Sequence, residues 1–287
     1  MKIAIFGVSG QLGRDVAGAL SAHQVEGVDH ARADIRDEDD VRRVVEALRP
    51  DWAINCAAMT HVDGCERDPL AAFENNALGA RVLARACAAN NARLLQISTD
   101  YVFDGCKGSA YVETDLPRPL NAYGISKLAG EHFARYECPR TVVVRTSGLY
   151  GVHVCRGKGS NFVETMLARA GGEDAMRVVA DERLTPTYTA DLAAQIRGMI
   201  EAAVAPGVYH ATNAGDCSWH EFTVELLRLA GVTAQVQPIR AADWKSPTRR
   251  PANSVLENRA LQALDLDVMP EWRDALSRYV TVRATAA

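Results

Sequence analysis

The chain has 287 residues, of which 48% are hydrophobic and 24% are charged, and its formal net charge is −4. This length suffices for one large α/β domain or two modest ones, and the small net charge gives no reason to expect nucleic acid or a membrane surface as a partner. The opening MKIAIFGVSG is too short an apolar run to span a bilayer and lacks a secretory cleavage pattern. Because the seven cysteines are scattered without C-x-x-C spacing, we expect reduced thiols in a cytoplasmic protein.

Apolar segments alternate with segments of helical spacing along the first half of the chain. The apolar segments predict strands over 2–8, 24–30, 51–58, 92–103 and 140–151. The segments between them predict helices over 11–23, 38–50, 69–91 and around 121–132. Strands that are apolar throughout and alternate with helices are typical of a parallel sheet covered on both faces. The sequence therefore predicts an α/β fold with a doubly wound parallel sheet of Rossmann type.

The regularity weakens after about residue 150, where prolines, tryptophans and short loops increase. Strand-like stretches recur at 175–182 and 207–212, and 153–159 has the character of a loop. We expect an NAD(P)-binding domain over 1–151 with later returns near 175–193 and 207–212. Residues 152–287 are then mostly a smaller, interleaved substrate-binding domain.

A glycine-rich turn joins the first predicted strand to the first predicted helix. Gly7, Gly10 and Gly13 follow the spacing G-x-x-G-x-x-G. Glycines let the backbone approach a pyrophosphate, and the N-terminus of the helix offers unpaired N–H groups and a partial positive charge. This position in a βα unit favours a dinucleotide site over a purely structural turn.

Acidic residues near the end of the second predicted strand are candidates for the adenosine side of that site. Asp29 lies about 16 residues beyond Gly13, where an acid would bind the ribose. Asp34, together with Ile35, could flank the adenine. A solvent-exposed helix cap is an equal alternative for Asp34.

Tyr123 and Lys127 stand four residues apart in the segment NAYGISKLAGEH, so they share one face of a helix. Such a pair can reflect simple packing, with the lysine stem extending past the ring. Alternatively, the lysine charge lowers the tyrosine pKa and suits the phenol to proton transfer. Thr99 precedes Tyr123 by 24 residues and lies at the carboxyl end of the fourth strand, where ligands of such sheets bind, although threonine also favours strands for itself.

With these residues the chain resembles the extended short-chain dehydrogenases/reductases, and among them the dTDP-4-dehydrorhamnose reductases. The similarity runs in order along essentially the whole chain, through GVSGQLG, NCAAMTHVDGCE, ISTDYVFDG, YGISKLAGE, RTSGLYG, SNFVETML, TPTYTADLA, RRPANSVL and PEWRDAL. The resemblance implies that Tyr123 gives a proton to a ketone oxygen while a nicotinamide delivers hydride. Lys127 would bind the nicotinamide ribose and Thr99 the same ketone oxygen, with Asp100 beside it.

The resemblance also implies which residues bind NADPH or NADH and a nucleotide-diphosphate sugar. Besides Tyr123 and Lys127, the implied cofactor contacts are Gly7, Gly10, Gln11, Leu12, Gly13, Asp29, Asp34, Ile35, Ala57, Ala58 and Met59, and Asn76 would steady the site. Besides Thr99 and Asp100, the implied substrate contacts are Val62, Asn161 and Arg250. A guanidinium suits a diphosphate, but Arg250 could also be half of a solvated pair with Arg249.

The family usually has tryptophan where this chain has Gly148. The missing indole predicts a wider sugar pocket, closed by Tyr150, Tyr188 or a residue of 152–160, and a lower KM after Gly148→Trp. Some members dimerise through acidic residues and magnesium, but Asp15 alone is too little to indicate this. We expect no catalytic metal, and a monomer or homodimer.

The predicted function is reduction of the 4-keto group of a nucleotide-linked deoxysugar with NADPH or NADH, with dTDP-4-dehydro-L-rhamnose converted to dTDP-L-rhamnose. One alternative is a dinucleotide-binding regulatory subunit resembling the beta subunit of methionine adenosyltransferase. Another alternative is a sugar-nucleotide epimerase, which would keep its cofactor tightly bound.

Overall fold

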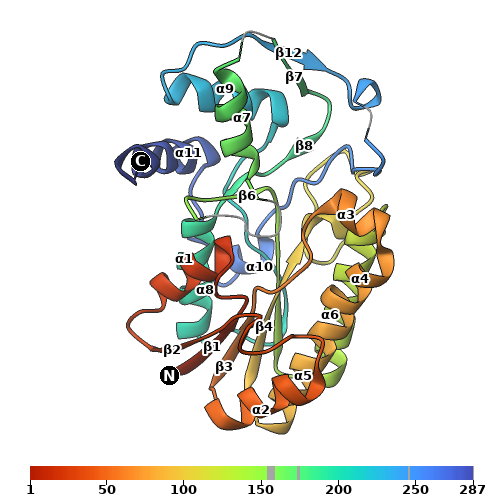
Figure 1. Ribbon diagram of the computed structural model, residues 1–287, viewed down its shortest axis with the longest axis vertical. Helices are drawn as coiled ribbons and strands as arrows, with labels where there is room; N and C mark the ends of the chain where they lie inside the picture. The colour runs from red at the N-terminus through yellow and green to blue at the C-terminus, as the bar shows by residue number, and fades with distance from the viewer. Residues whose placement is uncertain (154–158, 173–174, 245, 287) are drawn as a thin grey trace.

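A parallel sheet of six strands forms the centre of the computed structural model, which describes residues 1–153, 159–172, 175–244 and 246–286 (Figure 1). The strand order is β10-β5-β4-β3-β1-β2. The strands are β1 (Lys2–Phe6), β2 (Gln24–Val28), β3 (Trp52–Asn55), β4 (Arg93–Thr99), β5 (Thr141–Thr146) and β10 (Gly207–His210). Strand β1 lies between β2 and β3, so the direction in which strands are added reverses there. The predicted doubly wound Rossmann-type fold is confirmed.

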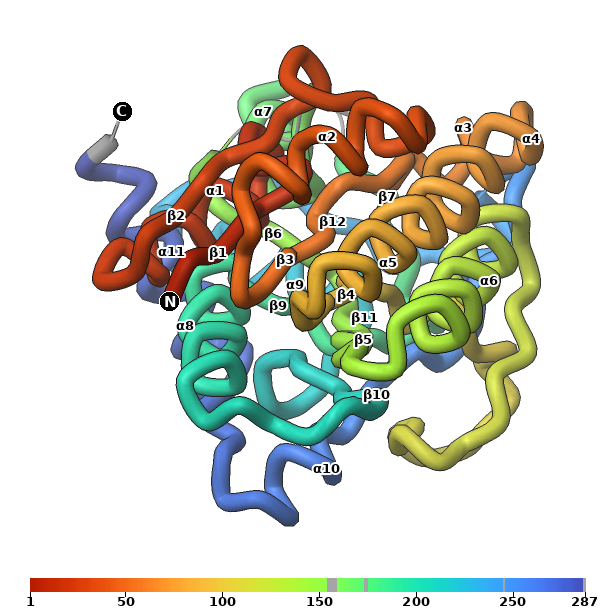
Figure 2. Tube along the Cα trace, turned by 90° about the horizontal axis from the view of Figure 1, so that it is seen from below, coloured from red at the N-terminus to blue at the C-terminus, as the bar shows by residue number. Residues whose placement is uncertain are grey.

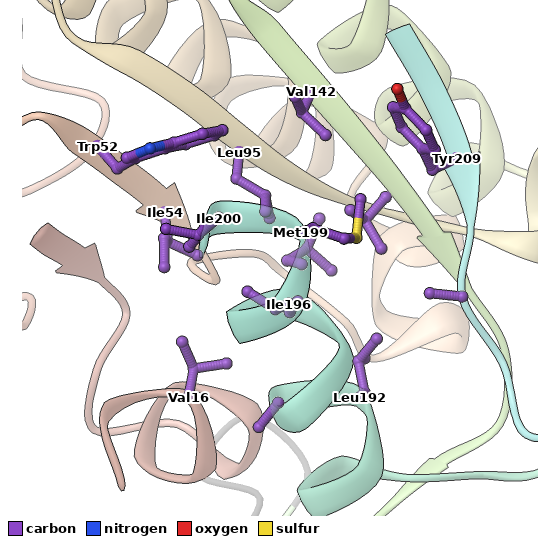
Figure 3. Close-up of a cluster of buried hydrophobic side chains, with 14 of the residues drawn as sticks. Val16, Trp52, Ile54, Leu95, Val142, Leu192, Ile196, Met199, Ile200 and Tyr209 are labelled. Atoms are coloured by element: carbon purple, nitrogen blue, oxygen red, sulfur yellow. The ribbon is translucent and has the colours of Figure 1, made fainter. Parts of the chain in front are cut away.

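Alternate side chains of the strands supply two separate hydrophobic cores. In β1, Ile3 and Ile5 pack toward α1 (Gln11–Ala19) and α8 (Thr189–Glu201), and Figure 3 shows Leu192, Ile196 and Met199 of α8 in this core. The intervening Ala4 and Phe6 belong to the core on the other face. That face carries helices α2 (Glu38–Leu48), α5 (Gly79–Ala89) and α6 (Ala122–Glu137) (Figure 2). This two-sided burial explains why the inner strands are largely apolar, whereas the edge strand β2, QVEGV, is only partly buried.

The single helix expected over 69–91 is divided into three parts. These are α4 (Pro69–Phe73), a π-helical turn η1 (Glu74–Leu78) and α5. The wider turn contains the buried Asn76, which contacts the loop that follows β3. A π-turn of this kind often marks a functional position, and here it brings an amide to the edge of the site.

A second group of elements lies beyond the carboxyl ends of the sheet strands, at the top of Figure 1. Three small two-stranded sheets pair β6 (Leu149–Tyr150) with β9 (Thr187–Tyr188), β7 (Met176–Val179) with β12 (Val236–Ile239), and β8 (Arg183–Leu184) with β11 (Cys217–Ser218). Helices α7 (Phe162–Ala170), α9 (Trp219–Leu229) and α11 (Trp272–Ala286) share one core with them.

The interleaving expected from the sequence needs one correction. Strand β10 does return to the central sheet, parallel to β5, and α8 packs on that sheet. Strand β7, however, pairs with β12 and not with the central sheet, so the expected return near 175–193 is wrong in its first part. The domain division at residue 151 stays a prediction, and most of the loop expected over 153–159 lies outside the described residues.

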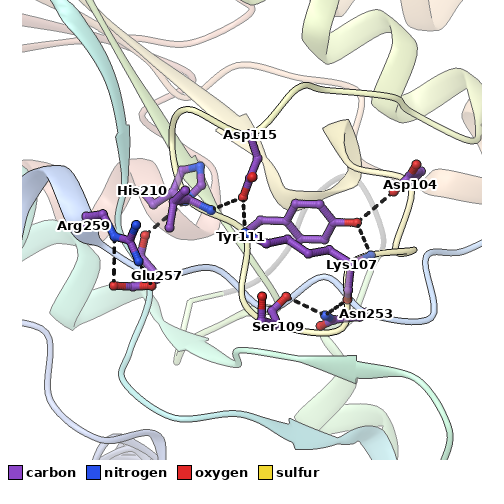
Figure 4. Close-up of polar contacts among 10 residues, drawn as sticks. Asp104, Lys107, Ser109, Tyr111, Asp115, His210, Asn253, Glu257 and Arg259 are labelled. Carbon is purple, nitrogen blue, oxygen red and sulfur yellow. Dashed lines mark hydrogen bonds and ion pairs between the residues drawn. The ribbon is translucent and has the colours of Figure 1, made fainter.

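The segment after β4 is tied to the C-terminal part of the chain (Figure 4). Asn253 Nδ2 donates to the carbonyls of Lys107 (2.7 Å) and Ser109 (2.9 Å). Tyr111 forms a β-bridge with Leu256, and its hydroxyl donates to Asp104 Oδ1 at 2.8 Å. These contacts bring residues near 250–256 to the carboxyl end of β4. The remaining short helices are α3 (Val62–Arg67), η2 (Asp100–Val102), η3 (Ala241–Asp243) and α10 (Arg259–Gln262).

Candidate active site

A cavity of about 500 Å³ lies at the carboxyl ends of β1, β3, β4 and β5, between the central sheet and the second group of elements. This is the place where open parallel sheets bind ligands, beside the reversal in strand order. Except for Met59 and Arg250, every site residue predicted from the sequence lines this cavity. The sequence prediction therefore selects residues that the fold brings together from distant parts of the chain.

The glycine turn between β1 and α1 has the shape needed to receive a pyrophosphate. Gly7 has a φ of +77°, and a Cβ atom there would lie 2.6 Å from the backbone nitrogen of Ala57. A Cβ atom at Gly13 would lie 2.4 Å from the carbonyl oxygen of Gly7. Helix α1 begins after Gly10 with no acidic residue in its first turn, so its free N–H groups favour an anion. This turn fits the dinucleotide that the sequence predicts.

Two aspartates line the part of the cavity beyond β2, where the sequence predicts the adenosine, and each has a neighbouring arginine. Asp29 Oδ1 accepts from the backbone nitrogen of Arg32 at 3.1 Å, and the Arg32 guanidinium donates to the Gly27 carbonyl at 2.8 Å. The bidentate hydrogen bond from Arg36 lowers the pKa of Asp34 to about 2. Helix α2 is capped by Asp37, so the alternative role of Asp34 as the helix cap is wrong.

Asn76 holds the loop after β3 in place. Its Oδ1 accepts from the backbone nitrogen of Met59 (2.8 Å), and its Nδ2 donates to the Met59 carbonyl and to Ser126 Oγ, both at 3.0 Å. The loop of Ala57 and Ala58 is thereby fixed against helix α6. Met59 contributes its backbone to this anchor and does not itself line the cavity.

Tyr123 and Lys127 lie on α6, whose first turn is capped by the Asn121 side chain accepting from the Gly124 nitrogen at 2.9 Å. A Cβ atom at position 124 would lie 2.1 Å from the Tyr101 carbonyl oxygen, so glycine is needed for the helix to approach η2. The rings of Tyr101 and Tyr123 meet edge to face at 5.9 Å. This close packing presents Tyr123 to the same cavity as Thr99 at the end of β4.

Burial dominates the protonation of this catalytic group. It raises the pKa of the Tyr123 phenol above its usual value, and the Thr99 hydrogen bond opposes this shift. Burial also lowers the pKa of Lys127 to about 8, while Nζ donates to the Ile97 carbonyl at 2.7 Å. The expected lowering of the tyrosine pKa by Lys127 is therefore not seen, because desolvation of the phenolate dominates and the charge of Asp100 adds to it. The protonated phenol is the form that a proton donor requires.

Asp100 is the centre of a small polar group that the sequence only partly indicates. Its carboxylate accepts from Thr99 Oγ1 at 2.9 Å and from Ser147 Oγ at 2.8 Å. Burial raises the pKa of Asp100, and hydrogen bonds from Ser254, Ser147 and Thr99 oppose that shift. Ser147 and Ser254 both line the cavity. Neither serine could be selected from the sequence, because a serine in RTSGLYG or RRPANSVL carries no local signal of a place in the cavity wall.

Asn161 is both a helix cap and a residue of the cavity wall. Its Oδ1 accepts from the Glu164 nitrogen at 2.9 Å and so caps α7. Its Nδ2 donates to the Gly151 carbonyl at 2.9 Å and lies 3.5 Å from Gln11 Oε1. The amide therefore connects α7 to the cofactor turn, and Val62 faces the same cavity from the start of α3.

Arg250 is held outside the cavity wall. Its Nη2 donates to Asp63 Oδ1 at 2.9 Å, and its Nη1 donates to Ser246 Oγ. The arginine is thus neither a solvated partner of Arg249 nor turned into the cavity, although the adjacent Pro251 lines it. Contact with a substrate diphosphate would require Arg250 to leave Asp63, so its binding role stays a prediction.

The backbone conformation at Gly148 would be strained with any other residue. This opposes the benefit that was expected from a tryptophan at this position. Its φ is +55°, and a Cβ atom would lie 2.8 Å from Leu184 Cδ1 and 3.3 Å from the Thr185 carbonyl oxygen. Left-handed backbone costs an L-residue about 1–2 kcal/mol. The position therefore selects glycine for its backbone, and a lower KM after Gly148→Trp is no longer expected.

We expect Gly148→Ala to reduce the free energy of unfolding by at least about 1 kcal/mol, and Gly148→Trp by more. Urea unfolding followed by circular dichroism measures this change. The matched control is Gly198→Ala in α8, where a Cβ atom would meet nothing within 4 Å. The control should be neutral or stabilising by up to about 1 kcal/mol. Equal stability of the two alanine variants would contradict the argument.

No grouping of three or more His, Cys, Asp or Glu side chains suited to a metal ion occurs among residues 1–153, 159–172, 175–244 and 246–286. Asp15 Oδ1 lies 3.4 Å from His153 Nε2. Within the same ranges, no helix is both long enough and apolar enough to cross a membrane.

The glycine turn, the phenol of Tyr123 and the ammonium of Lys127 all line one cavity. This arrangement defines the class of protein, which is an NAD(P)-dependent oxidoreductase of the short-chain dehydrogenase/reductase type. Within that class, the family described as "RmlD substrate binding domain" matches residues 1–284, and the chain belongs to this family. The family predicted from the sequence, that of the dTDP-4-dehydrorhamnose reductases, is thereby confirmed.

Similar proteins support the same assignment. The chain is 39% identical to the dTDP-4-dehydrorhamnose reductase of Streptomyces griseus, over 95% of this chain and 91% of that protein. It superposes on a dTDP-4-dehydrorhamnose reductase from Clostridium acetobutylicum with a TM-score of 0.94 and 38% identity, covering 98% of this chain and 99% of that one. The enzyme from Bacillus anthracis, solved in complex with NADP, gives a TM-score of 0.93 and 36% identity over the same shares.

Proposed function

We propose that the protein reduces the 4-keto group of a nucleotide-linked deoxysugar, converting dTDP-4-dehydro-L-rhamnose to dTDP-L-rhamnose. The observation that carries this proposal is the shared cavity, which the protonated Tyr123, its neighbour Thr99 and the glycine turn before α1 all line. Family membership and the relatives' reaction support the choice of substrate.

Different residues of the chain have different roles in the proposed reaction. A bound NADPH or NADH supplies the hydride. Tyr123 donates its phenolic proton to the ketone oxygen, and Thr99 donates a hydrogen bond to that oxygen. Lys127, whose pKa of about 8 leaves it largely charged near neutral pH, favours the phenolate that remains after the transfer. Ser147 keeps Asp100 hydrogen-bonded beside them, while Thr99, whose single hydroxyl hydrogen is directed to Asp100 in this structure, turns that hydrogen to the ketone oxygen when the substrate binds.

The test is NADPH oxidation by the purified protein with a small panel of dTDP-4-keto sugars. Turnover of dTDP-4-dehydrorhamnose is the expected result. Dinucleotide binding without turnover of any sugar would contradict the proposal and favour the regulatory-subunit alternative. Purification with tightly bound NAD, together with epimerisation in place of net reduction, would favour the epimerase.

The Asp29 region predicts that both cofactors are used. A carboxylate at the end of β2 suits the ribose hydroxyls of NADH. Arg32 follows Asp29 by three residues and is hydrogen-bonded to the Gly27 carbonyl. Its guanidinium can bind the 2′-phosphate of NADPH. We expect the kcat/KM values for NADPH and NADH to differ by less than about 100-fold, equivalent to about 2.7 kcal/mol. Arg32→Ala should shift the ratio toward NADH. A larger preference in the wild type, or no shift in the variant, would contradict this explanation.

Two further expectations belong to the proposal. The protein acts as a monomer or a homodimer, which sedimentation velocity measures directly. Its reaction takes place in the cytoplasm, which cell fractionation tests.

A further inference from the structure

Two aromatic side chains stand in the cavity wall that the sequence analysis did not select. Phe162 and Trp219 both line the cavity, and their ring centroids are 4.4 Å apart at an angle of 43°. Each is the first residue of a helix, following the capping residues Asn161 and Ser218. Because the caps fix where both helices begin, they also fix where the two rings lie.

The pair is supported from behind but only partly covered. Phe222, which is fully buried, lies 6.1 Å from the Phe162 ring, and behind it is Trp272 at 5.7 Å. Phe162 and Trp219 themselves are only partly buried at the edge of this core. Rigid aromatic side chains that leave surface open to a cavity are suited to an apolar ligand face.

Contacts on both sides connect this aromatic wall to the segment around Gly148 and to the cofactor turn. Strand β11, just before Trp219, pairs Cys217 with Leu184, and Leu184 packs against Gly148 next to Ser147. On the other side Asn161, just before Phe162, reaches Gln11 of the cofactor turn. A ring whose keto carbon lies near Tyr123 shares this one cavity with the wall, since all three side chains line it.

We propose that Phe162 and Trp219 bind the hexose of the substrate and determine specificity for a deoxysugar; this inference rests on the proposed function. A 6-deoxyhexose offers a methyl group and a C–H face to aromatic rings. The wall supplies the aromatic surface that Gly148 does not, and the left-handed backbone at Gly148 disfavours a side chain there. Tyr188, one of the residues expected to close the pocket, does not line the cavity, although Tyr150 does.

The test compares Trp219→Leu and Phe162→Leu with the wild type in three measurements. These are KM for dTDP-4-dehydrorhamnose, the inhibition constant of dTDP, which has no hexose, and the Kd of NADPH. We expect each leucine variant to raise KM about tenfold, equivalent to about 1.4 kcal/mol, with the dTDP and NADPH constants changed less than twofold. Trp219→Phe should restore most of the loss. Val224→Ala, on an exposed position of the same helix α9, is the matched control and should leave all three constants unchanged.

Other outcomes would overturn the inference. If the leucine variants keep the wild-type KM but unfold at a lower temperature, Phe162 and Trp219 only stabilise the core and do not bind the hexose. If the inhibition constant of dTDP rises together with KM, the wall binds the thymine base. If the Kd of NADPH rises, the wall binds the nicotinamide. A wild-type protein that binds NADPH and dTDP but reduces no keto sugar would instead refute the proposed function, and this inference with it.

Discussion

Replacing Tyr123 with phenylalanine is expected to lower kcat for keto-sugar reduction by at least about 100-fold, since general acid catalysis typically contributes 10²–10⁴-fold. The substitution keeps the ring and its edge-to-face contact with Tyr101 and removes only the hydroxyl. Burial holds the phenol in its protonated form, so the wild type has a proton ready at this position. Steady-state NADPH oxidation measures the loss.

Two comparisons make this experiment specific. The Kd of NADPH for Tyr123→Phe, measured by fluorescence titration, should stay within about twofold of the wild type, as expected for lost acid catalysis alone. Lys127→Ala should reduce both rate and cofactor affinity, because its ammonium serves both. Tyr101→Phe removes a neighbouring hydroxyl from the same cavity and should cost less than about tenfold if it transfers no proton. Near wild-type turnover by Tyr123→Phe would refute its role as the acid.

Local patterns predicted the cofactor turn and the catalytic helix, because each depends on residues close in sequence. The G-x-x-G-x-x-G turn follows from the need for backbone at Gly7 and Gly13, where a Cβ atom would clash. Tyr123 and Lys127 follow from the period of one helix. The strands were predicted for the same reason, since each is apolar over its own length.

Features that depend on contacts between distant segments were not predictable in this way. The segment containing β7 looks like any buried strand, and nothing local says that it pairs with β12. Arg250 looked free to bind a diphosphate, yet its partner Asp63 is 187 residues away in sequence. The pairing of Phe162 with Trp219 likewise joins two helices from separate parts of the chain.

Gly148 shows a different kind of error. The sequence interpretation treated it as a missing side chain, whereas the structure has a left-handed backbone that favours glycine. A glycine can be selected for its φ angle or for lack of a side chain, and the letter alone does not distinguish the two.

A buried ion pair behind the catalytic lysine carries the largest expected effect on stability. Glu131, one turn after Lys127 on α6, accepts from Arg145 Nε at 2.9 Å and Nη2 at 2.7 Å, and both side chains of the pair are 4% exposed. Ser98 Oγ also donates to Glu131. Removing one partner of such a pair leaves a buried charge without compensation, which costs about 3–5 kcal/mol.

We therefore expect Arg145→Met to lower the free energy of unfolding by about 3–5 kcal/mol, as measured by urea denaturation. The exposed pair of Arg42 with Asp39 is the control, and Arg42→Met should cost less than about 1 kcal/mol. The double variant Arg145→Met/Glu131→Gln should recover part of the loss, because no carboxylate is left without its arginine and Ser98 keeps an acceptor, while Lys127 loses the favourable charge of Glu131. A double variant less stable than Arg145→Met would show that the charge itself is not the cause.

The same pair also predicts a pH effect through Lys127. Burial lowers the pKa of Lys127 to about 8, and the charge of Glu131 partly offsets this by raising it. Glu131→Gln should therefore lower the lysine pKa further, so the ammonium is lost at a lower pH. Since the proposed mechanism has the charged lysine favour the phenolate and bind the cofactor ribose, the alkaline fall in kcat/KM should move to lower pH in Glu131→Gln. If kcat/KM of Glu131→Gln is lower at every pH but falls at the same alkaline pH as in the wild type, Glu131 has only a structural role.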